Sequence, residues 1–227
     1  MGSEMCIRDR NGTVLEKLYG NPEDPNSKVL GFQPLQGAKV FVSAPSQKIV
    51  LDSDEKGTFT THVTESTRYT ITASKEGYFT KSTYLTVDEK DPENPRRVYT
   101  VELVLDKIFK NKEITLEDIY YDYDKSYIRP DAEPSLNRLI TILQQNPTIR
   151  IQLSSHTDCR GNNAYNKALS QKRAQAAVDY LISRGIEASR LAAVGYGEES
   201  PAFTCKCSDC TEEEHQGNRR TTFKVIE

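Results

Sequence analysis

The hydrophobic pattern of this chain changes its period near the middle. In the segment 98–105, alternate residues are apolar, whereas in the segment 136–143 the apolar residues recur at positions i, i+3, i+4 and i+7. A period of two indicates a strand with one buried face, and a period near 3.6 indicates an amphipathic helix. The charged segment 106–117 separates the two patterns. We therefore predict two domains, an all-β domain followed by an α/β domain.

The length of 227 residues suits two domains of about 100 residues each. We assign residues 11–105 to the first domain, residues 106–117 to a linker and residues 118–227 to the second. Residues 1–10 have neither periodicity nor the apolar stretch of a signal peptide, so we expect a non-native leader outside the fold.

The first domain has short strands that are rich in β-branched and aromatic residues, a pattern typical of a β-sandwich. The clearest predicted strands are 39–42, 69–73 and 98–105, and turn residues gather at 21–26, 52–57, 76–77 and 91–95. The segment 52–63 begins like a calcium loop. However, Lys56 and Val63 occupy positions where an EF-hand needs an oxygen ligand, so we predict a hairpin turn there.

The second domain alternates strands with helices, which indicates a sheet with helices packed on one face. Asn146-Pro147 ends the first predicted helix and Gly185 caps the second. The predicted order is β-α-β-α-β, a long loop, then β: strand 119–123, helix 131–145, strand 149–153, helix 164–184, strand 191–196 and strand 221–226.

The overall charge excludes some function classes. A net charge of −3 and a pI near 5.8 give no sign of the basic face that nucleic-acid binding needs, so we expect no nucleic-acid partner. No apolar run approaches the roughly 20 residues that cross a bilayer, so we expect no transmembrane segment in this chain.

An acid and an arginine are predicted to meet at one edge of the second sheet. Asp158 follows a predicted strand, and Arg173 lies in the first half of the next helix. Ligand sites often lie where strands of an α/β sheet end. A carboxylate accepts hydrogen bonds from an ammonium and a guanidinium forks onto a carboxylate, so together the pair suits a zwitterion. From spacing alone, a structural ion pair remains an alternative.

The motifs around this pair resemble a known family. Residues 155–161 read Ser-His-Thr-Asp-Cys-Arg-Gly, residues 169–174 read Leu-Ser-Gln-Lys-Arg-Ala, and residues 218–220 read Asn-Arg-Arg. From 119 to 226, the chain resembles the OmpA-like domain of outer-membrane proteins, peptidoglycan-associated lipoproteins and flagellar stators. The resemblance implies non-covalent, non-catalytic binding of the meso-diaminopimelate in the peptidoglycan stem peptide, without a cofactor or a metal.

The resemblance also implies roles for individual residues. Asp158 would take the ligand ammonium, Arg173 would take the carboxylate, and Asn166 would add a polar contact. The remaining predicted site residues line or brace the pocket: Thr157, Leu169, Asn218, Arg219 and Tyr123. Ser155 and Cys159 depart from the usual motif, which has glycine before His-Thr-Asp and no cysteine after it.

Two further resemblances concern the first domain and the source. Segments 34–40, 52–59 and 69–78 resemble the carboxypeptidase regulatory-like domain, a spacer or adhesion module without peptidase activity. The cysteine-containing loop 205–216 resembles that of OmpA family members from the Bacteroidota. Together these resemblances place the chain at the periplasmic face of the outer membrane, where other outer-membrane proteins are candidate partners.

The cysteines outside the leader can form disulfides or bind a metal. Cys205, Cys207 and Cys210 with His215 offer the ligands of a Cys3His zinc site. Ligands so close in sequence crowd a tetrahedron, and the implied envelope location favours disulfides. We predict Cys205–Cys210, with Cys159–Cys207 as a hypothesis for the second bridge.

No catalytic residues are predicted. Residues 155–158 contain the letters of a catalytic triad, but neighbouring strand residues alternate between faces and cannot converge. A Cys159–His156 nucleophile has only weak support. Three readings therefore remain: a tether between the outer membrane and the wall, the targeting module of a cell-wall hydrolase, and a protein-interaction domain with a drifted site.

Overall fold

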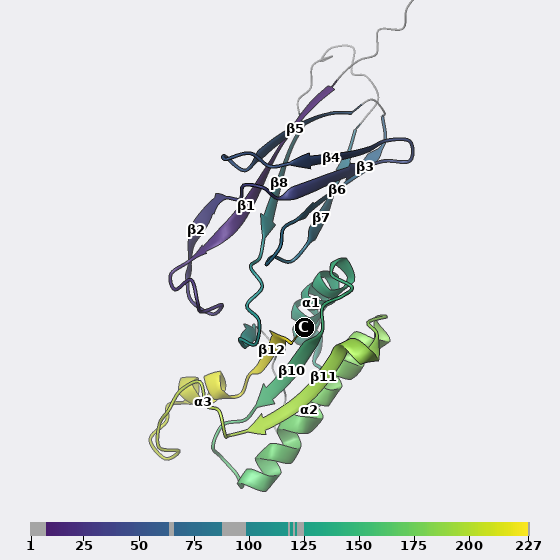
Figure 1. Ribbon diagram of the computed structural model, residues 1–227. Helices are drawn as coiled ribbons and strands as arrows, with labels where there is room; N and C mark the ends of the chain where they lie inside the picture. The colour runs from purple at the N-terminus through teal and green to yellow at the C-terminus, as the bar shows by residue number, and fades with distance from the viewer. Residues whose placement is uncertain are drawn as a thin grey trace, which may run out of the picture. The chain divides into compact units, whose positions relative to one another are not determined.

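The computed structural model describes residues 8–63, 66–87, 99–117, 119, 121 and 125–226 (Figure 1). The chain forms two compact units. Unit 1 comprises residues 1–22 and 27–108, and unit 2 comprises residues 23–26 and 109–227.

Unit 1 contains two four-stranded sheets. In the first sheet, β1 is antiparallel to β2 and to β5, which pair with different parts of one edge of β1. The other edge of β1 pairs in parallel with β8. The second has the order β4-β3-β6-β7 and is antiparallel throughout. The strands are β1 Arg8–Tyr19, β2 Val29–Pro34, β3 Lys39–Ser43, β4 Lys48–Asp52, β5 Thr58–Val63, β6 Arg68–Ser74, β7 Lys81–Thr86 and β8 Tyr99–Leu105.

Alternation along the strands builds the core of unit 1. In β5 and β6, every second residue is buried, because successive side chains of a strand point to opposite faces. The buried faces of both sheets contribute to one cluster, which includes Val14, Val40, Phe59, Tyr69 and Leu103. The three strands predicted in this half all have counterparts, in β3, β6 and β8.

The segment predicted as a hairpin turn is a turn between two sheets. β4 pairs with β3 and β5 pairs with β1, so the turn at 53–57 carries the chain from one sheet to the other. The Asp54 carboxylate accepts hydrogen bonds from the backbone N–H groups of Lys56 and Thr58 and from the Thr58 hydroxyl. Gly57 has φ +70°, and a Cβ there would lie 2.4 Å from the Val14 carbonyl oxygen. These contacts account for the Asp and Gly of this segment without a metal ion.

The boundaries of unit 1 differ from the predicted ones. β1 begins at Arg8, inside the segment that we set aside as a leader, and residues 8–13 pair with β5. Residues 1–10 show no hydrophobic period because only residues 8–10 belong to β1. Most of that strand lies after residue 10. The predicted turn at 91–95, Val98 and residues 1–7 lie outside the described residues.

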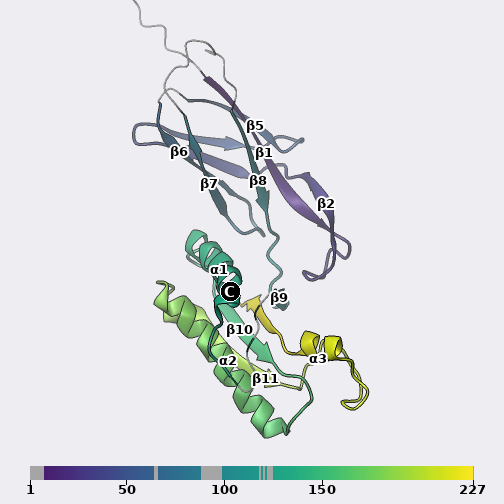
Figure 2. The same cartoon turned by 180° about the vertical axis from the view of Figure 1, so that it is seen from behind.

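Unit 2 is a mixed four-stranded sheet with the order β11-β10-β12-β9. β10 and β11 are parallel and are joined through α2, whereas β12 is antiparallel to both β10 and β9. The two longer helices, α1 and α2, lie on the same face of this sheet (Figures 1 and 2). The elements are β9 Ile114–Leu116, the 3-10 turn Pro130–Ala132, α1 Glu133–Gln145, β10 Ile151–His156, α2 Asn163–Ser183, the 3-10 turn Ala188–Arg190, β11 Leu191–Gly197, α3 Glu212–Asn218 and β12 Thr221–Val225.

Buried apolar residues hold the helices against the sheet. Leu136, Leu139 and Leu143 of α1 are almost completely buried, as the helical period predicts. α2 runs so close to β11 that a Cβ on Gly195 would lie 2.2 Å from the Gln171 backbone nitrogen. None of the helices among the described residues is long and apolar enough to cross a membrane.

Three predictions for this half need correction. A strand of this sheet lies at Ile114–Leu116, inside the predicted linker. Of the strand predicted at 119–123, Ile119 and Tyr121 lie outside strands, and residues 120, 122 and 123 lie outside the described residues. The predicted long loop contains α3, whose Thr211 forms a capping box with Glu214. The strand predicted at 149–153 is shifted and runs from Ile151 to His156. The end of this strand was not predicted because Ser154, Ser155 and His156 are polar, although all three are buried.

Candidate functional site

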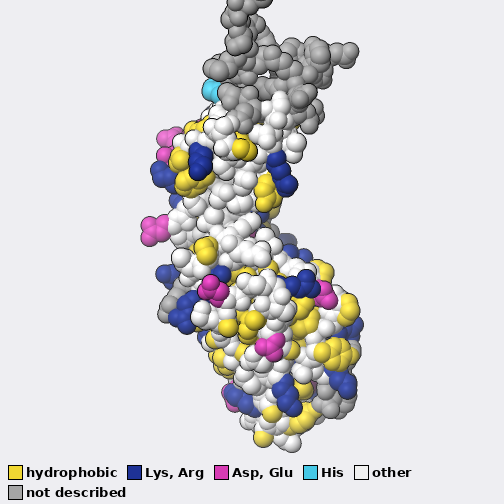
Figure 3. Space-filling view, turned by 90° about the vertical axis from the view of Figure 1, so that its right-hand side faces the viewer, with side chains coloured by type: hydrophobic (Ala, Val, Ile, Leu, Met, Phe, Trp, Pro, Cys, Tyr) yellow, Lys and Arg dark blue, Asp and Glu magenta, His cyan; other side chains and the backbone are white. Residues whose placement is uncertain are grey.

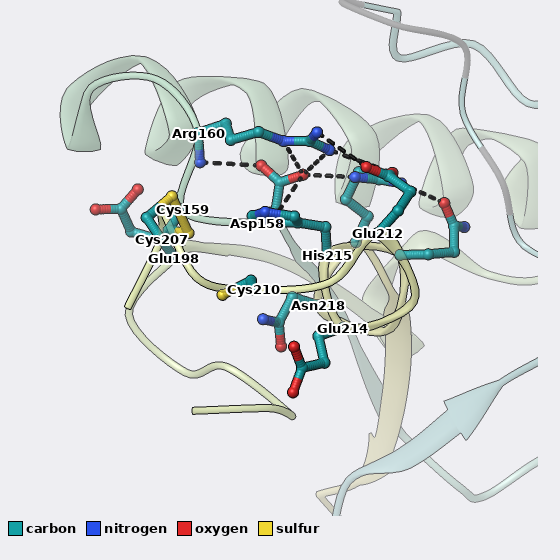
Figure 4. Close-up of polar contacts among 12 residues, drawn as sticks. Asp158, Cys159, Arg160, Glu198, Cys207, Cys210, Glu212, Glu214, His215 and Asn218 are labelled. Carbon is teal, nitrogen blue, oxygen red and sulfur yellow. Dashed lines mark hydrogen bonds and ion pairs between the residues drawn. A yellow bond between two sulfur atoms is a disulfide. The ribbon is translucent and has the colours of Figure 1, made fainter. Parts of the chain in front are cut away.

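The carboxylate of Asp158 is the centre of a charge network at the end of β10 (Figure 4). It is only 6% exposed. Its Oδ2 accepts hydrogen bonds from Arg160 Nη2 at 2.7 Å and from Arg219 Nη1 at 2.5 Å. Its Oδ1 accepts one from the Arg160 backbone N–H at 3.0 Å. Arg160 follows on the same loop, and Arg219 directly follows α3, so the network joins two distant parts of the chain.

Glu212, the first residue of α3, pairs with the same two arginines. Its Oε1 accepts from Arg219 Nη2 at 2.7 Å and its Oε2 accepts from Arg160 Nη1 at 3.1 Å. The four charges therefore alternate in sign around a ring: Asp158, Arg160, Glu212 and Arg219.

The network keeps its carboxylates ionised. Burial by itself raises the pKa of Asp158, but hydrogen bonds from Arg160 and Arg219 outweigh it and hold the pKa below its usual value. Hydrogen bonds from Arg219 and Arg160 likewise lower the pKa of Glu212. Asp158 is therefore a buried, charged acceptor near neutral pH.

A polar cleft of about 310 Å³ lies beside this network. Its lining comprises three arginines, one tyrosine and one glutamine: Arg129, Arg173, Arg219, Tyr121 and Gln216. Three guanidinium groups around one cleft suit an anionic group such as a carboxylate.

Arg173 is held in place within the cleft wall. It is only 4% exposed, and its guanidinium carbon lies 4.7 Å from the centre of the Tyr121 ring. Its Nε donates a hydrogen bond to the Lys125 carbonyl oxygen at 3.0 Å. The cation–π contact and this hydrogen bond fix the direction of the guanidinium.

Arg219 links the acid to the arginine-lined cleft. Arg219 bonds directly to Asp158 and also lines the cleft together with Arg173. The spacing argument placed the acid and Arg173 at one edge of the sheet. It did not identify Arg160 as a partner of the acid or Glu212 as the second carboxylate of the network, because a loop residue and the first residue of a seven-residue helix carry no periodic signal.

Other predicted site residues lie behind Asp158. Asn166 is buried, and its Nδ2 donates to Glu198 Oε2 at 2.6 Å and to the Asp158 carbonyl oxygen at 3.4 Å. Thr157 is buried, and its backbone N–H donates to the Gly197 carbonyl oxygen. These contacts brace the loop that carries the acid.

The remaining predicted residues are placed as follows. Asn218 is buried and bonds to both backbone groups of Phe203, so its side chain holds the loop before α3. Leu169 is half-buried on α2. Tyr123 lies outside the described residues. Arg129 and Gln216 line the cleft but were not predicted.

Two disulfides constrain the loop before α3, and one of them ties it to the acid-bearing loop. Cys159 bonds to Cys207, and Cys205 bonds to Cys210, with Cα–Cα distances of 5.7 and 5.5 Å. This is the pairing predicted from the sequence. The sulfur atoms of Cys159 and Cys210 also lie within 4.8 Å of one ring nitrogen of His215, but both sulfurs are engaged in disulfides.

His156 is a buried residue on β10 next to the site loop. It is 1% exposed and stacks on Tyr196, and neither ring nitrogen has a hydrogen-bond partner among the described residues. Glu113 Oε2 lies 3.6 Å from its Nε2. Burial and the nearby charge of Arg220 lower the pKa of His156 to about 3, so the imidazole stays neutral. It cannot act as a base poised near pH 7.

The surface away from the network carries mixed charge. On the face shown in Figure 3, basic, acidic and hydrophobic side chains are interspersed. This fits a net charge of −3, which gives no general attraction to a polyanion.

The comparisons with known proteins concern the same half of the chain. Residues 120–215 match the sequence model of the OmpA family. The chain is 40% identical over 92 residues to the peptidoglycan-associated lipoprotein of Brucella melitensis biotype 1, a match that covers 40% of this chain and 55% of the lipoprotein. It is 35% identical over 108 residues to outer membrane porin F of Pseudomonas fluorescens, covering 48% of this chain and 32% of the porin.

A solved structure is also similar. The crystal structure of the peptidoglycan-associated lipoprotein from Burkholderia pseudomallei is 29% identical, and the match covers 48% of this chain and 86% of that chain with a TM-score of 0.42. The chain spans 55% and 32% of the lengths of the two curated relatives above.

These matches define the class of the second half. Unit 2 contains an OmpA domain at residues 120–215. The two curated relatives described above are named as a peptidoglycan-associated lipoprotein and an outer membrane porin, and neither name is that of a catalytic family. The matches described above do not identify the type of the first domain.

Proposed function

We propose that unit 2 binds peptidoglycan without covalent chemistry, by holding the free amino-acid end of meso-diaminopimelate in the stem peptide. In this proposal the protein tethers the outer membrane to the cell wall from the periplasmic face. The names of the relatives, which include peptidoglycan-associated lipoproteins, support the class of ligand. The cleft geometry supports the kind of chemical group.

One observation carries the proposal: a buried carboxylate and an arginine-lined cleft are neighbours that share Arg219. A zwitterion presents an ammonium and a carboxylate to the same site. Asp158 would accept hydrogen bonds from the ammonium, and Arg173 would donate to the carboxylate. Each charge-assisted hydrogen bond contributes on the order of 1.5–3 kcal/mol.

The other predicted residues take supporting roles in this proposal. Asn166 and Thr157 hold the loop of Asp158 from behind, and Asn218 fixes the chain that leads into Arg219. Leu169 would pack under the site from α2, and Tyr123 keeps the role that the resemblance implies, since it lies outside the described residues. No cofactor or metal takes part in this binding.

We further propose that the segment 11–105 is a carboxypeptidase regulatory-like β-sandwich. It would act as a spacer or would contact other outer-membrane proteins. The two sheets of unit 1 with their common core agree with such an architecture. A cell-envelope location follows from the proposed ligand, and the disulfides suit an oxidising compartment.

The test is retention on purified peptidoglycan, with matched controls. Asp158→Ala and Arg173→Ala should lose retention, because each removes one half of the zwitterion site. Asp179→Ala and Lys172→Ala remove like charges from exposed positions of α2 and should bind like the wild-type protein. Circular dichroism should show the same helix content in all five proteins.

The outcome also separates the alternatives. Retention without release of wall fragments supports a tether. Release of soluble fragments would indicate a hydrolase that uses this domain for targeting. Absence of retention by the wild-type protein would refute the proposal and favour a protein-interaction domain.

A further inference from the structure

The contacts of Asp158 raise a question about how an ammonium could reach it. Both carboxylate oxygens already accept hydrogen bonds, and Oδ2 accepts from two guanidinium groups. A ligand ammonium that bonds to Oδ2 must take the place of a nitrogen now bonded there. Displacing Arg219 Nη1 without a second acceptor would leave a guanidinium that is only 26% exposed without its counter-charge.

Glu212 is placed to receive that guanidinium. It already accepts a hydrogen bond from the other terminal nitrogen of Arg219, and it pairs with Arg160 in the same way. If Arg219 rotates slightly away from Asp158, its guanidinium therefore stays paired with the Glu212 carboxylate. Gln216 Oε1 offers Arg219 Nη2 a further neutral acceptor on the same helix.

The position of Glu212 is fixed by the local chain. It is the first residue of α3, directly after the capping residue Thr211. The Cys205–Cys210 disulfide ends one residue before Thr211, and Cys207 is bonded to the neighbour of Asp158. A seven-residue helix is thereby held against the acid-bearing loop.

We propose that Glu212 is a positioning residue that lets a ligand ammonium compete for Asp158. This role rests on the proposed function and deepens it. With Glu212, the four ring residues sum to zero charge. Without its charge, the ring carries one excess positive charge that repels an ammonium and attracts a carboxylate, and Asp158 is then the ring's one carboxylate for both arginines.

The inference makes a distinction between two ligands. Replacing Glu212 by Gln should weaken binding of meso-diaminopimelate about 5-fold, because the ring loses one neighbouring negative charge that water partly screens at this exposed position. N,N′-diacetyl-diaminopimelate has no ammonium, so its affinity should stay unchanged or rise. Isothermal titration calorimetry on the full chain with intact disulfides measures both.

The matched control is Glu213→Gln. Glu213 is the exposed next residue of α3, so the variant has the same change in net charge and a similar effect on the helix terminus. It should bind both ligands like the wild-type protein. Glu212→Asp keeps the charge and should recover most of the affinity for meso-diaminopimelate.

The results separate this inference from the function on which it rests. If the wild-type protein binds meso-diaminopimelate but Glu212→Gln and Glu213→Gln bind it equally, Glu212 has no such role. Equal weakening of both ligands in Glu212→Gln would indicate a general structural defect and would also overturn the inference. If the wild-type protein binds neither ligand, the proposed function itself fails.

Discussion

Acid should destabilise unit 2 through His156 well before its carboxylates titrate. The folded-state pKa of His156 is about 3, below the usual value of 6.5, because the ring is buried and lies near the charge of Arg220. Below pH 6.5 the unfolded chain binds a proton at this residue that the folded chain does not bind. Above pH 6.5 this residue therefore leaves the free energy of unfolding at its full value. Below pH 6.5 the free energy of unfolding decreases as the pH falls.

The size of the effect follows from the difference in pKa. Linkage gives a loss of about 1.4 kcal/mol per pH unit once the unfolded histidine is protonated, or about 2 kcal/mol at pH 5.0. The carboxylates with lowered pKa, Asp158 and Glu212, lose their contribution only at lower pH, as the pH falls through their folded pKa values. The contribution of His156 is therefore the difference between the wild-type protein and a variant without this imidazole, each compared at pH 7.5 and pH 5.0.

The assay is urea unfolding followed by the helical circular dichroism signal. All α-helices among the described residues lie in unit 2, so this signal reports on that unit. The matched variant is His156→Phe, which keeps a ring against Tyr196 but cannot titrate. Because neither imidazole nitrogen has a hydrogen-bond partner in the described chain, the variant should lose little stability at pH 7.5. Equal losses between pH 7.5 and pH 5.0 in both proteins would refute the reasoning.

Three further predictions concern packing and the cross-links. Gly195→Ala should destabilise unit 2 by about 2 kcal/mol or more, because its Cβ would overlap the α2 backbone; urea unfolding measures this, and unchanged stability would contradict the packing. Leu153→Ala, at a fully buried position of β10, should cost about 3 kcal/mol in the same assay, whereas Ile182→Ala on the exposed side of α2 should cost under about 1 kcal/mol. Replacing both Cys159 and Cys207 by Ala should lower the stability of unit 2 by about 2–4 kcal/mol, and an unchanged melting temperature would show that the bridge constrains little.

Sequence patterns predicted the elements with a clear hydrophobic period. The apolar stripe of α1 fixed its length to within two residues, and β6 and β11 were predicted to within one residue at each end. Ser154 to His156 carry no apolar signal, yet they are buried strand residues, because the two serines pair with threonines of β12 and His156 stacks on Tyr196 of β11. A hydrophobic period cannot detect a strand that is buried by polar contacts.

The candidate site was only partly predictable for a related reason. Asp158 and Arg173 stood out because they belong to recognisable motifs. Arg129, Glu212 and Gln216 lie in segments where charge is common, and only the fold brings them to the same cleft or ring. α3 was hidden because a seven-residue helix is too short to show a period, although its capping box, Thr211 with Glu214, was a readable signal.

The Cys159–Cys207 bridge has a mechanical consequence for a protein under tension. The bridge joins residues that are 48 positions apart, and this segment includes the whole of α2 and β11. A pull on the two ends of unit 2 cannot extend the enclosed chain, which would otherwise lengthen by about 160 Å at full extension. In the tether proposed above, this segment would therefore act as a short, stiff connector when the envelope swells, and not as a long elastic one.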